Sequence, residues 1–264
     1  MTLMDQHAVM DDLATATLIM NQKIAVVMPV YIKIDEALIL TENCIDSLGD
    51  VFLVIVDNGS DRGREYLEQM SDKYIRNEEN LGYAVACNQG LKYLQQEHPE
   101  LHLIAIVGND TRISPNWQEI STEILADEKV YSVHFRVIPY DELFDYGEDL
   151  YTSGRERWCT QHFFVVDTTK GLEFFDEQFV NSYDDWDMQL RVRATGRQTA
   201  YTNKVCVQHV DNFTQKQIPE REENNRKNAE KFKAKHGEYA EVLFTRMYPD
   251  QMKLPYFEEF KIRR

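Results

Sequence analysis

The chain has 264 residues, of which 43% are hydrophobic and 11% aromatic, a composition typical of a globular protein that can bury a substantial core. Its 45 acidic side chains outnumber its 29 basic ones and give a formal net charge of -16. Because this charge repels phosphate, we expect no non-specific binding to nucleic acid or to anionic lipid surfaces.

The cysteines and the N-terminal residues indicate the compartment. The four cysteines lie far apart, without a Cys-x-x-Cys pair: Cys44, Cys87, Cys159 and Cys206. This spacing predicts reduced, buried thiols rather than disulfides or a zinc site, and hence a cytoplasmic protein. Residues 1–22 carry acidic side chains where a signal peptide needs basic ones, and their apolar run is too short for a transmembrane segment. We expect an N-terminal arm or helix there.

The first half of the chain alternates apolar strands with helical segments. Strands are expected at residues 23–30, 51–56 and 74–76 and in the stretch 103–111, where Gly108, Asn109 and Asp110 stop the strand. Helices are expected over 36–48 and, within and after 77–90, on a face that includes Ala84, Cys87, Leu91 and Leu94. This alternation predicts βαβ units and a parallel sheet. The continuous apolar run before Gly108 predicts a strand buried on both faces of that sheet, and Pro29 is expected to end the first strand.

The second half has a different pattern. Helices are expected over 117–127, through the polar cluster of 180–193 and over 219–237, and strands at 130–138, 163–166 and 199–209. Residues 140–154 have no clear period and are expected to form a mobile or acceptor-facing loop. The aromatic segment 247–264 is expected to pack on the domain.

Polar side chains follow three of the predicted strands. Asp57 follows the second strand, Asn109 and Asp110 follow the fourth, and His209 ends a late one. Ligands bind at the carboxyl ends of strands in open α/β sheets, so we expect these groups to converge.

These groups have a chemical and a structural interpretation. The carboxylate of Asp110 suits Mg²⁺ or Mn²⁺ on a diphosphate, and a nitrogen ligand from His209 favours Mn²⁺. The structural alternatives are a turn at Asn109 and Asp110, a helix N-cap at Asp57 and a hydrogen-bonded histidine at His209.

A second polar cluster contains three carboxylates in four positions. Asp184, Asp187 and Arg191 share one face of a predicted helix. The carboxylates could simply favour the positive end of the helix dipole. Close like charges also raise one another's pKa, so that one of Asp184, Asp185 and Asp187 could serve as a general base near neutral pH. No GxGxxG follows the first strand, and no GxxxxGK[ST], HExxH or GxSxG occurs, which argues against a dinucleotide dehydrogenase, a P-loop enzyme, a zincin or an α/β-hydrolase.

Six segments, in order, resemble the glycosyltransferase family 2 enzymes of GT-A fold. They are VVMPVY (26–31), VIVDNGSDR (54–62), NLGYAVACNQGL (80–91), VGNDTRISPNW (107–117), FDEQFVNSYDDWDMQLRVRATG (175–196) and VQHV (207–210). The resemblance implies an α/β fold with a Rossmann-like, mostly parallel sheet flanked by helices over residues 23–237. It places the nucleotide-binding half at about 23–115, the acceptor and catalytic half at about 116–237, and a C-terminal extension at 238–264.

The resemblance also implies the donor side of the site. A nucleotide-sugar donor would lie across the carboxyl ends of the strands, with Pro29 and Tyr31 framing the base and Asp57 bonding the base or ribose. The remaining donor-side positions are Gly82, Asn88, Asn109 and Arg191.

The metal and catalytic positions follow in the same way. Asp110 and His209 match metal ligands for Mn²⁺ or Mg²⁺. Gly108 stands where the family's DxD motif has its first carboxylate, so the metal would rely on the diphosphate and water. Asp185 matches the catalytic base, beside Asp184 in place of a glutamate. The acceptor-side candidates are Trp158, Gln161, His162, Trp186 and Asp187.

The implied reaction is transfer of a sugar, with inversion, to an acceptor hydroxyl on a saccharide, a lipid-linked sugar, a protein or a modified nucleobase. The alternative is a non-catalytic nucleotide-sugar binding protein of the same fold, which Gly108 favours and the cluster at 184–187 opposes. A sugar-1-phosphate nucleotidyltransferase would need a glycine-rich, basic loop after the first strand, and none is present.

Overall fold

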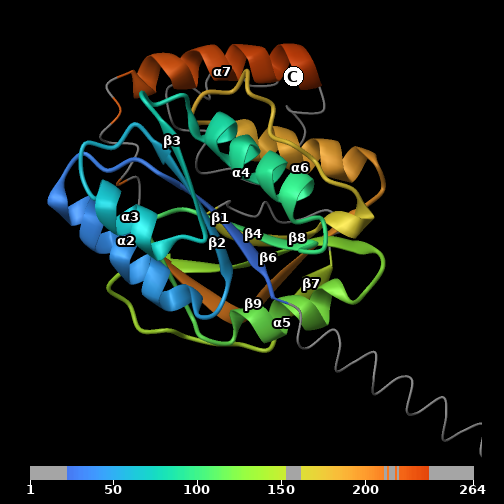
Figure 1. Cartoon of the computed structure of the whole chain (residues 1–264). Coiled ribbons are helices and arrows are strands. Elements are labelled where there is room, and N and C mark those ends of the chain that lie inside the picture. The colour runs from blue at the N-terminus through green and yellow to red at the C-terminus, as the bar shows by residue number, and fades with distance from the viewer. Residues whose placement is uncertain (1–22, 153–161, 211–212, 214–217, 219, 238–264) are drawn as a thin grey trace, which may run out of the picture.

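A computed structural model describes residues 23–152, 162–210, 213, 218 and 220–237 (Figure 1). The predicted arm at 1–22 and the extension at 238–264 lie outside the described residues. A nine-stranded sheet forms the centre, in the order β3-β2-β1-β4-β8-β6-β9-β5, and β7 pairs with β9. Among the described residues, no helix has the length and apolar character needed to cross a membrane.

The first half of the sheet is built from βαβ units, as the sequence predicts. Its elements are β1 (Ala25–Val30), α2 (Asp35–Leu48), β2 (Phe52–Asn58), α3 (Arg64–Met70), β3 (Lys73–Asn77), α4 (Tyr83–Glu97) and β4 (Leu103–Val107). The four strands pair in parallel. The sequence does not identify α3, which buries only Leu67 and therefore has no apolar period of its own.

The second half of the sheet is mixed. Its elements are β5 (Thr111–Ile113), α5 (Trp117–Leu125), β6 (Val130–Pro139), β7 (Leu150–Thr152), β8 (Phe163–Asp167), a 3-10 helix (Thr168–Lys170), α6 (Asp184–Ala194), β9 (Gln198–His209) and α7 (Arg221–His236). Strands β6 and β9 are parallel, while β8 runs antiparallel to both β4 and β6. The irregular loop expected at 140–154 contains the short strand β7.

Two expectations about single strands are wrong. Strand β4 ends at Val107, just before Gly108 as expected, but its neighbours are not both parallel: it pairs in parallel with β1 and antiparallel with β8. An apolar run records burial on both faces but not the direction of the neighbours. Pro29 does not end β1, which continues to Val30. Pairing with β4 stops at Val27, so Pro29 has a partner on one side only and its missing donor is tolerated.

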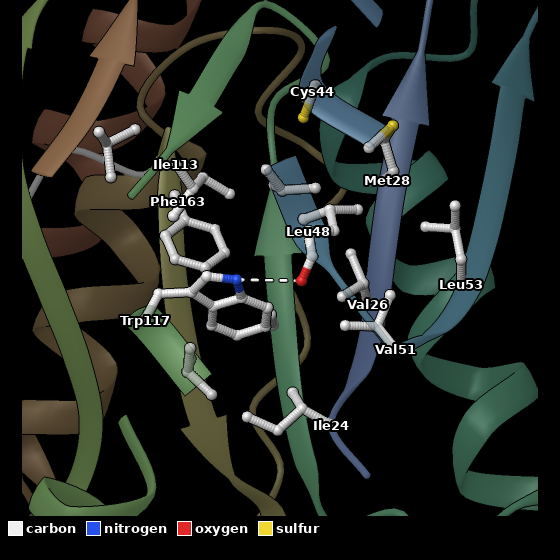
Figure 2. Close-up of a cluster of buried hydrophobic side chains, with 14 of the residues drawn as sticks. Ile24, Val26, Met28, Cys44, Leu48, Val51, Leu53, Ile113, Trp117 and Phe163 are labelled. Atoms are coloured by element: carbon white, nitrogen blue, oxygen red, sulfur yellow. Dashed lines mark hydrogen bonds between the residues drawn. The ribbon is translucent and has the colours of Figure 1, made fainter. Parts of the chain in front are cut away.

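Each face of the sheet has its own core. Helices α2 and α5 cover one face, where the Trp117 indole donates to the Leu48 carbonyl at 3.2 Å and its ring meets Phe163 edge-on (Figure 2). Helices α4 and α6 cover the other face. Helix α7 packs on the outer side of α6 through a third cluster around Phe232 (Figure 1). Cys44, Cys87 and Cys206 are buried free thiols, as expected, and Cys159 lies outside the described residues.

Candidate active site

The turn after β4 and the end of β9 meet. Asp110 immediately precedes β5, whose first residue, Thr111, is in register with His209 on β9. Asp110 Oδ1 therefore lies 3.5 Å from His209 Nε2, and both side chains are about nine-tenths buried. The Val210 N–H donates to the Asp110 carbonyl at 3.2 Å and holds the turn against the strand end. The structure thus brings together the two predicted metal ligands, which are 99 positions apart in the sequence.

Gly108 allows this turn to close. Its N–H donates to the His162 carbonyl at 2.8 Å, and a Cβ at this position would lie 3.1 Å from Asp110 Oδ1. A carboxylate side chain here would crowd Asp110. The ring of His162 stacks on that of His209, with centroids 3.6 Å apart and an interplanar angle of 22°.

A cavity of about 530 Å³ opens beside this pair. It is lined by residues 137–141 at the end of β6 and by His162, His209 and Val210. The Tyr140 hydroxyl is buried and has no hydrogen-bond partner among the described residues. The cavity therefore combines apolar walls with polar groups next to the Asp110 carboxylate.

The donor atoms of Asp110 and His209 suit a divalent cation. Neighbouring ligands of an octahedral Mg²⁺ stand about 3 Å apart, close to the spacing of this pair. The described residues contain no group of three or more His, Cys, Asp or Glu side chains arranged to hold a metal. A cation here would need further oxygen ligands from a substrate or from water. Asn109 is buried, and its amide nitrogen donates to Thr41 Oγ1 of α2 at 2.9 Å.

Asp57 lies at the end of β2 with no exposed surface. Its Oδ1 accepts from the Ser60 N–H at 2.8 Å, and its Oδ2 accepts from the Tyr74 hydroxyl at 2.5 Å and from Arg76. Helix α3 begins only at Arg64, so Asp57 closes a turn and is not the helix N-cap. Burial, and then the bond to Asp57, raise the pKa of Tyr74 to about 12.

The sequence alone does not identify Arg76 as a partner of Asp57. The sequence does place Arg76 two residues after Tyr74 on a predicted strand, so that the two side chains share one face of the strand. Only the β2–β3 register, in which Asp57 is opposite Arg76, shows what that face meets. The predicted base-side residues lie nearby: Val30 is opposite Asp57, between Pro29 and the half-buried Tyr31.

Gly82 begins α4 with a positive φ of 95° that favours glycine. Asn58, at the end of β2, donates from its amide to the Gly82 carbonyl at 3.2 Å. The next N–H, of Tyr83, donates to Asn181 Oδ1 at 2.9 Å. The start of α4 is therefore bonded both to the Asp57 strand end and to the turn that precedes α6.

The turn before α6 holds two residues in the left-handed region, Asn181 (φ 59°) and Tyr183 (φ 67°). This conformation is rare for an aromatic residue and costs on the order of 1–3 kcal/mol. Asp184 follows at once, is 6% exposed, and its Oδ2 has no hydrogen-bond partner among the described residues. Asp185 is half-buried and accepts from the Trp186 N–H at 2.8 Å.

Burial raises the pKa values of these two carboxyl groups to different extents. Desolvation, and then the charge of Asp185, raise the pKa of Asp184 to about 8. Desolvation raises the pKa of Asp185 to about 6. Both carboxyl groups therefore hold their protons to higher pH than an exposed aspartate, and Asp184 does so more strongly than Asp185.

The comparisons with known proteins now identify the family. The sequence profile described as glycosyl transferase family 2 matches residues 25–181, more than half of the chain. The chain belongs to glycosyl transferase family 2. It is therefore a glycosyltransferase, and its structure has the GT-A-like architecture expected of that family.

A solved structure has the same fold. The crystal structure of S. aureus TarS 1–349 superposes with a TM-score of 0.57 at 13% identity, covering 89% of this chain and 75% of that one. At this identity the likeness shows the fold alone. A comparison with curated proteins gives no match.

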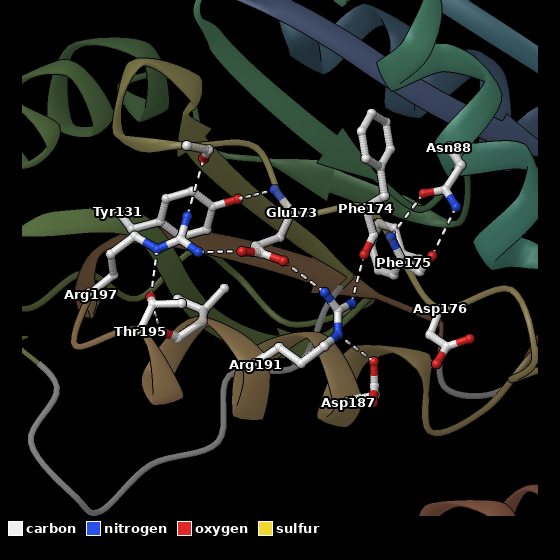
Figure 3. A network of polar contacts seen from close by, with 12 residues as sticks. Asn88, Tyr131, Glu173, Phe174, Phe175, Asp176, Asp187, Arg191, Thr195 and Arg197 are labelled. Atoms are coloured by element: carbon white, nitrogen blue, oxygen red, sulfur yellow. Dashed lines mark hydrogen bonds and ion pairs between the residues drawn. The ribbon is translucent and has the colours of Figure 1, made fainter. Parts of the chain in front are cut away.

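Two residues predicted to face the substrates have partners within this family 2 domain (Figure 3). Arg191 donates to Asp187 Oδ2 and Glu173 Oε2, each at 2.8 Å, and to the Phe174 carbonyl at 2.6 Å. Asp187 is fully buried, and its Oδ1 lies 2.5 Å from Lys235 Nζ and 2.8 Å from His236 Nε2. These groups join α6 to residues 173–174 and to α7.

Asn88 is a third predicted substrate-side residue with internal partners. Its amide donates to the Phe175 carbonyl and to Glu177, and its oxygen accepts from the Phe175 N–H at 2.8 Å (Figure 3). It therefore clamps α4 to the segment before α6. Trp186 is half-buried with its ring 5.0 Å from that of Tyr183, while Trp158 and Gln161 lie outside the described residues.

Proposed function

We propose that this family 2 glycosyltransferase moves a sugar from a nucleotide diphosphate to an acceptor hydroxyl, with inversion and with Asp185 as the general base. The bond between the start of α4 and the turn before α6 carries this proposal. At the start of α4, Gly82 is bonded to Asn58 at the end of β2, and Tyr83 is bonded to Asn181 in the turn before Asp184 and Asp185. These two bonds link the proposed donor-binding end of β2 to the carboxyl pair. Asp184 is close enough for its charge to contribute to the raised pKa of Tyr83, after the larger effect of burial.

The two carboxyl groups have different tasks. Asp185 ionises first, so it accepts the proton of the acceptor hydroxyl as that oxygen bonds to the anomeric carbon. The bond from this carbon to the diphosphate oxygen breaks, and the diphosphate leaves with the electron pair. A single displacement of this kind inverts the anomeric centre. Asp184 stays protonated near neutral pH, which leaves Asp185 as the one charged base of the pair.

Asp110 and His209 would hold a divalent cation, and their oxygen and nitrogen donors fit Mn²⁺ or Mg²⁺. Such a cation supplies positive charge that stabilises a departing diphosphate. The protein's part is to keep both donor side chains buried and adjacent, through the Val210 bond and the stacked ring of His162.

Asp57 and Tyr31 are our proposed contacts for the base or ribose. Arg76 and Tyr74 donate to the Asp57 carboxylate and orient it from one side. We assign Arg191, Asp187 and Asn88 to positioning, because their polar groups bind other parts of the protein. The cavity beside His162 and Tyr140 is our candidate for the acceptor hydroxyl.

The test begins with the donor. Thermal unfolding is measured with a panel of UDP-, GDP-, TDP- and CDP-sugars, with and without Mn²⁺. We expect at least one donor to raise the melting temperature, and more so with the metal, because a ligand that binds only the folded state stabilises it. Stabilisation by none of them would contradict the proposed donor class.

The base is tested with that donor by Asp185→Asn. We expect release of nucleoside diphosphate to fall by roughly 10²-fold or more, because general base catalysis contributes about this much. Thermal stabilisation by the donor should persist. Asp50→Asn is the matched control, since Asp50 is exposed and pairs only with Lys23 at 3.0 Å among the described residues. If Asp185→Asn released nucleoside diphosphate at the wild-type rate, Asp185 would not be the general base.

A further inference from the structure

Helix α7 lies beyond the segment that matches the family profile, yet it contacts the turn before Asp184 and Asp185. Asn228, on its buried face, is 1% exposed. Its amide nitrogen is 2.9 Å from the Val180 carbonyl, 3.0 Å from the Ser182 carbonyl and 2.9 Å from Ser182 Oγ. One side chain thus provides donors to a turn about 46 residues earlier.

The residue that Asn228 holds is the centre of the strained turn. Ser182 stands between Asn181 and Tyr183, the two left-handed residues. Such conformations persist only where the surrounding structure holds them. Without the bonds from Asn228, the turn can relax toward negative φ, and a rotation there would carry Asp184 and Asp185 with it, since they are the first two residues of α6.

Packing supports the same contact. Phe232, one helical turn after Asn228, is fully buried, with its ring 5.4 Å from Tyr183 and 6.1 Å from Phe179. Lys231 Nζ donates to the Gln178 carbonyl at 2.5 Å. Helix α7 therefore holds the turn by contacts on both sides of Ser182, and Asn228 makes the bonds at its centre.

We propose that Asn228 is a positioning residue that fixes the carboxyl pair of α6 for sugar transfer. The inference rests on the proposed role of Asp185. Its consequence is that part of the catalytic geometry is set by a helix outside the family's matched segment. Asn228 does not contact the carboxyl pair in this proposal; it holds the backbone of residues 180–182, which leads into α6.

Two variants test this in the full chain. Asn228→Ala removes the donors, and Asn228→Asp keeps the size while placing carboxylate oxygens against two carbonyl oxygens. We expect both to lower turnover by roughly tenfold to hundredfold, the cost of a displacement of about 1 Å in a catalytic group. The donor concentration that gives half-maximal turnover should not change. Turnover is followed as nucleoside diphosphate released, with water as the acceptor of the sugar, from whichever of UDP-glucose, UDP-N-acetylglucosamine and GDP-mannose stabilises the wild type most.

Two controls separate positioning from stability. Lys227→Ala alters an exposed neighbour on the same helix and should leave turnover unchanged. Ile124→Ala creates a cavity in the distant α5 core and should lower the melting temperature while retaining turnover below it. Wild-type turnover in both Asn228 variants would overturn the inference, as would an equal loss in Ile124→Ala. Reduced turnover in Asn228→Ala beside full turnover in Asp185→Asn would overturn the proposed base and leave the turn as the functional element.

Discussion

Asp184 and Asp185 show how position alone differentiates two identical side chains. Asp184 points into the protein next to α4, while Asp185 keeps part of its surface in solvent. Burial costs an ionised carboxylate its hydration, so the more enclosed group holds its proton to higher pH. In the proposed mechanism, an aspartate can therefore stand beside the base in place of a glutamate, because its enclosed environment favours the protonated form.

Asp184→Asn should be tolerated near pH 7, because the asparagine replaces a group that is already uncharged there. We expect turnover to stay within several-fold of wild type and to rise through about pH 6 in both proteins, as Asp185 ionises. The measurement is a pH profile of nucleoside diphosphate release. A loss as large as that of Asp185→Asn would show that the charge of Asp184 is required.

Asp184→Asn should also change how the free energy of unfolding depends on pH. The pKa of Asp184 is higher in the folded protein than in the unfolded chain, so the folded state binds more protons between the two values. Its contribution to the free energy of unfolding is present at low pH and is lost as pH rises toward about 8. Urea unfolding at several pH values should therefore show a flatter pH dependence in Asp184→Asn than in the wild type.

At the level of elements, the close approach of α4 to β1 fixes the position of α4. Gly90 makes this approach possible, because a Cβ there would lie 2.5 Å from Val27 Cγ1. Val27 is fully buried and, being β-branched, has a stiff side chain that cannot turn aside cheaply.

Gly90→Ala should consequently destabilise the protein by about 1–3 kcal/mol, despite the better helix propensity of alanine. Chemical denaturation measures the change. Gln95→Ala, at an exposed position on the same helix, is the control and should be neutral or slightly stabilising. Equal stability of Gly90→Ala and the wild type would show that α4 can move away from the sheet.

For the whole molecule, the matched family segment and the folding unit differ. Residues 25–181 include β1 to β8 but omit β9, which pairs with β5, β6 and β7. Strands β5 and β7 have no other partner among the described residues. The turn before α6, at residues 180–183, also contacts α7, which lies beyond the matched segment.

A chain that ends at residue 181 should therefore not unfold cooperatively, because loss of β9 exposes the edge of β6 and leaves two strands unpaired. Circular dichroism during heating measures this, and a chain that ends at residue 237, which keeps every described element, is the control. A cooperative transition in the shorter chain would show that the parallel half folds alone.

The sequence by itself determined most of the elements, in their order along the chain, and the enzyme family. The βαβ pattern, the buried strands and the strand-end positions of Asp57, Asp110 and His209 follow from local periodicity and turn residues, which are written in contiguous segments. The cluster at 184–187 was likewise visible, since helical spacing places its side chains on one face.

Only the tertiary structure decided which groups meet. Strand register sets the antiparallel course of β8 and the contact of Arg76 with Asp57. Packing of α7 on the turn before α6 sets the bonds from Asn228 to Ser182. No local pattern in the sequence records either. The split between Asp184 and Asp185 has the same origin, because desolvation depends on what covers a side chain. Periodicity records which residues are buried, and packing decides what they are buried against.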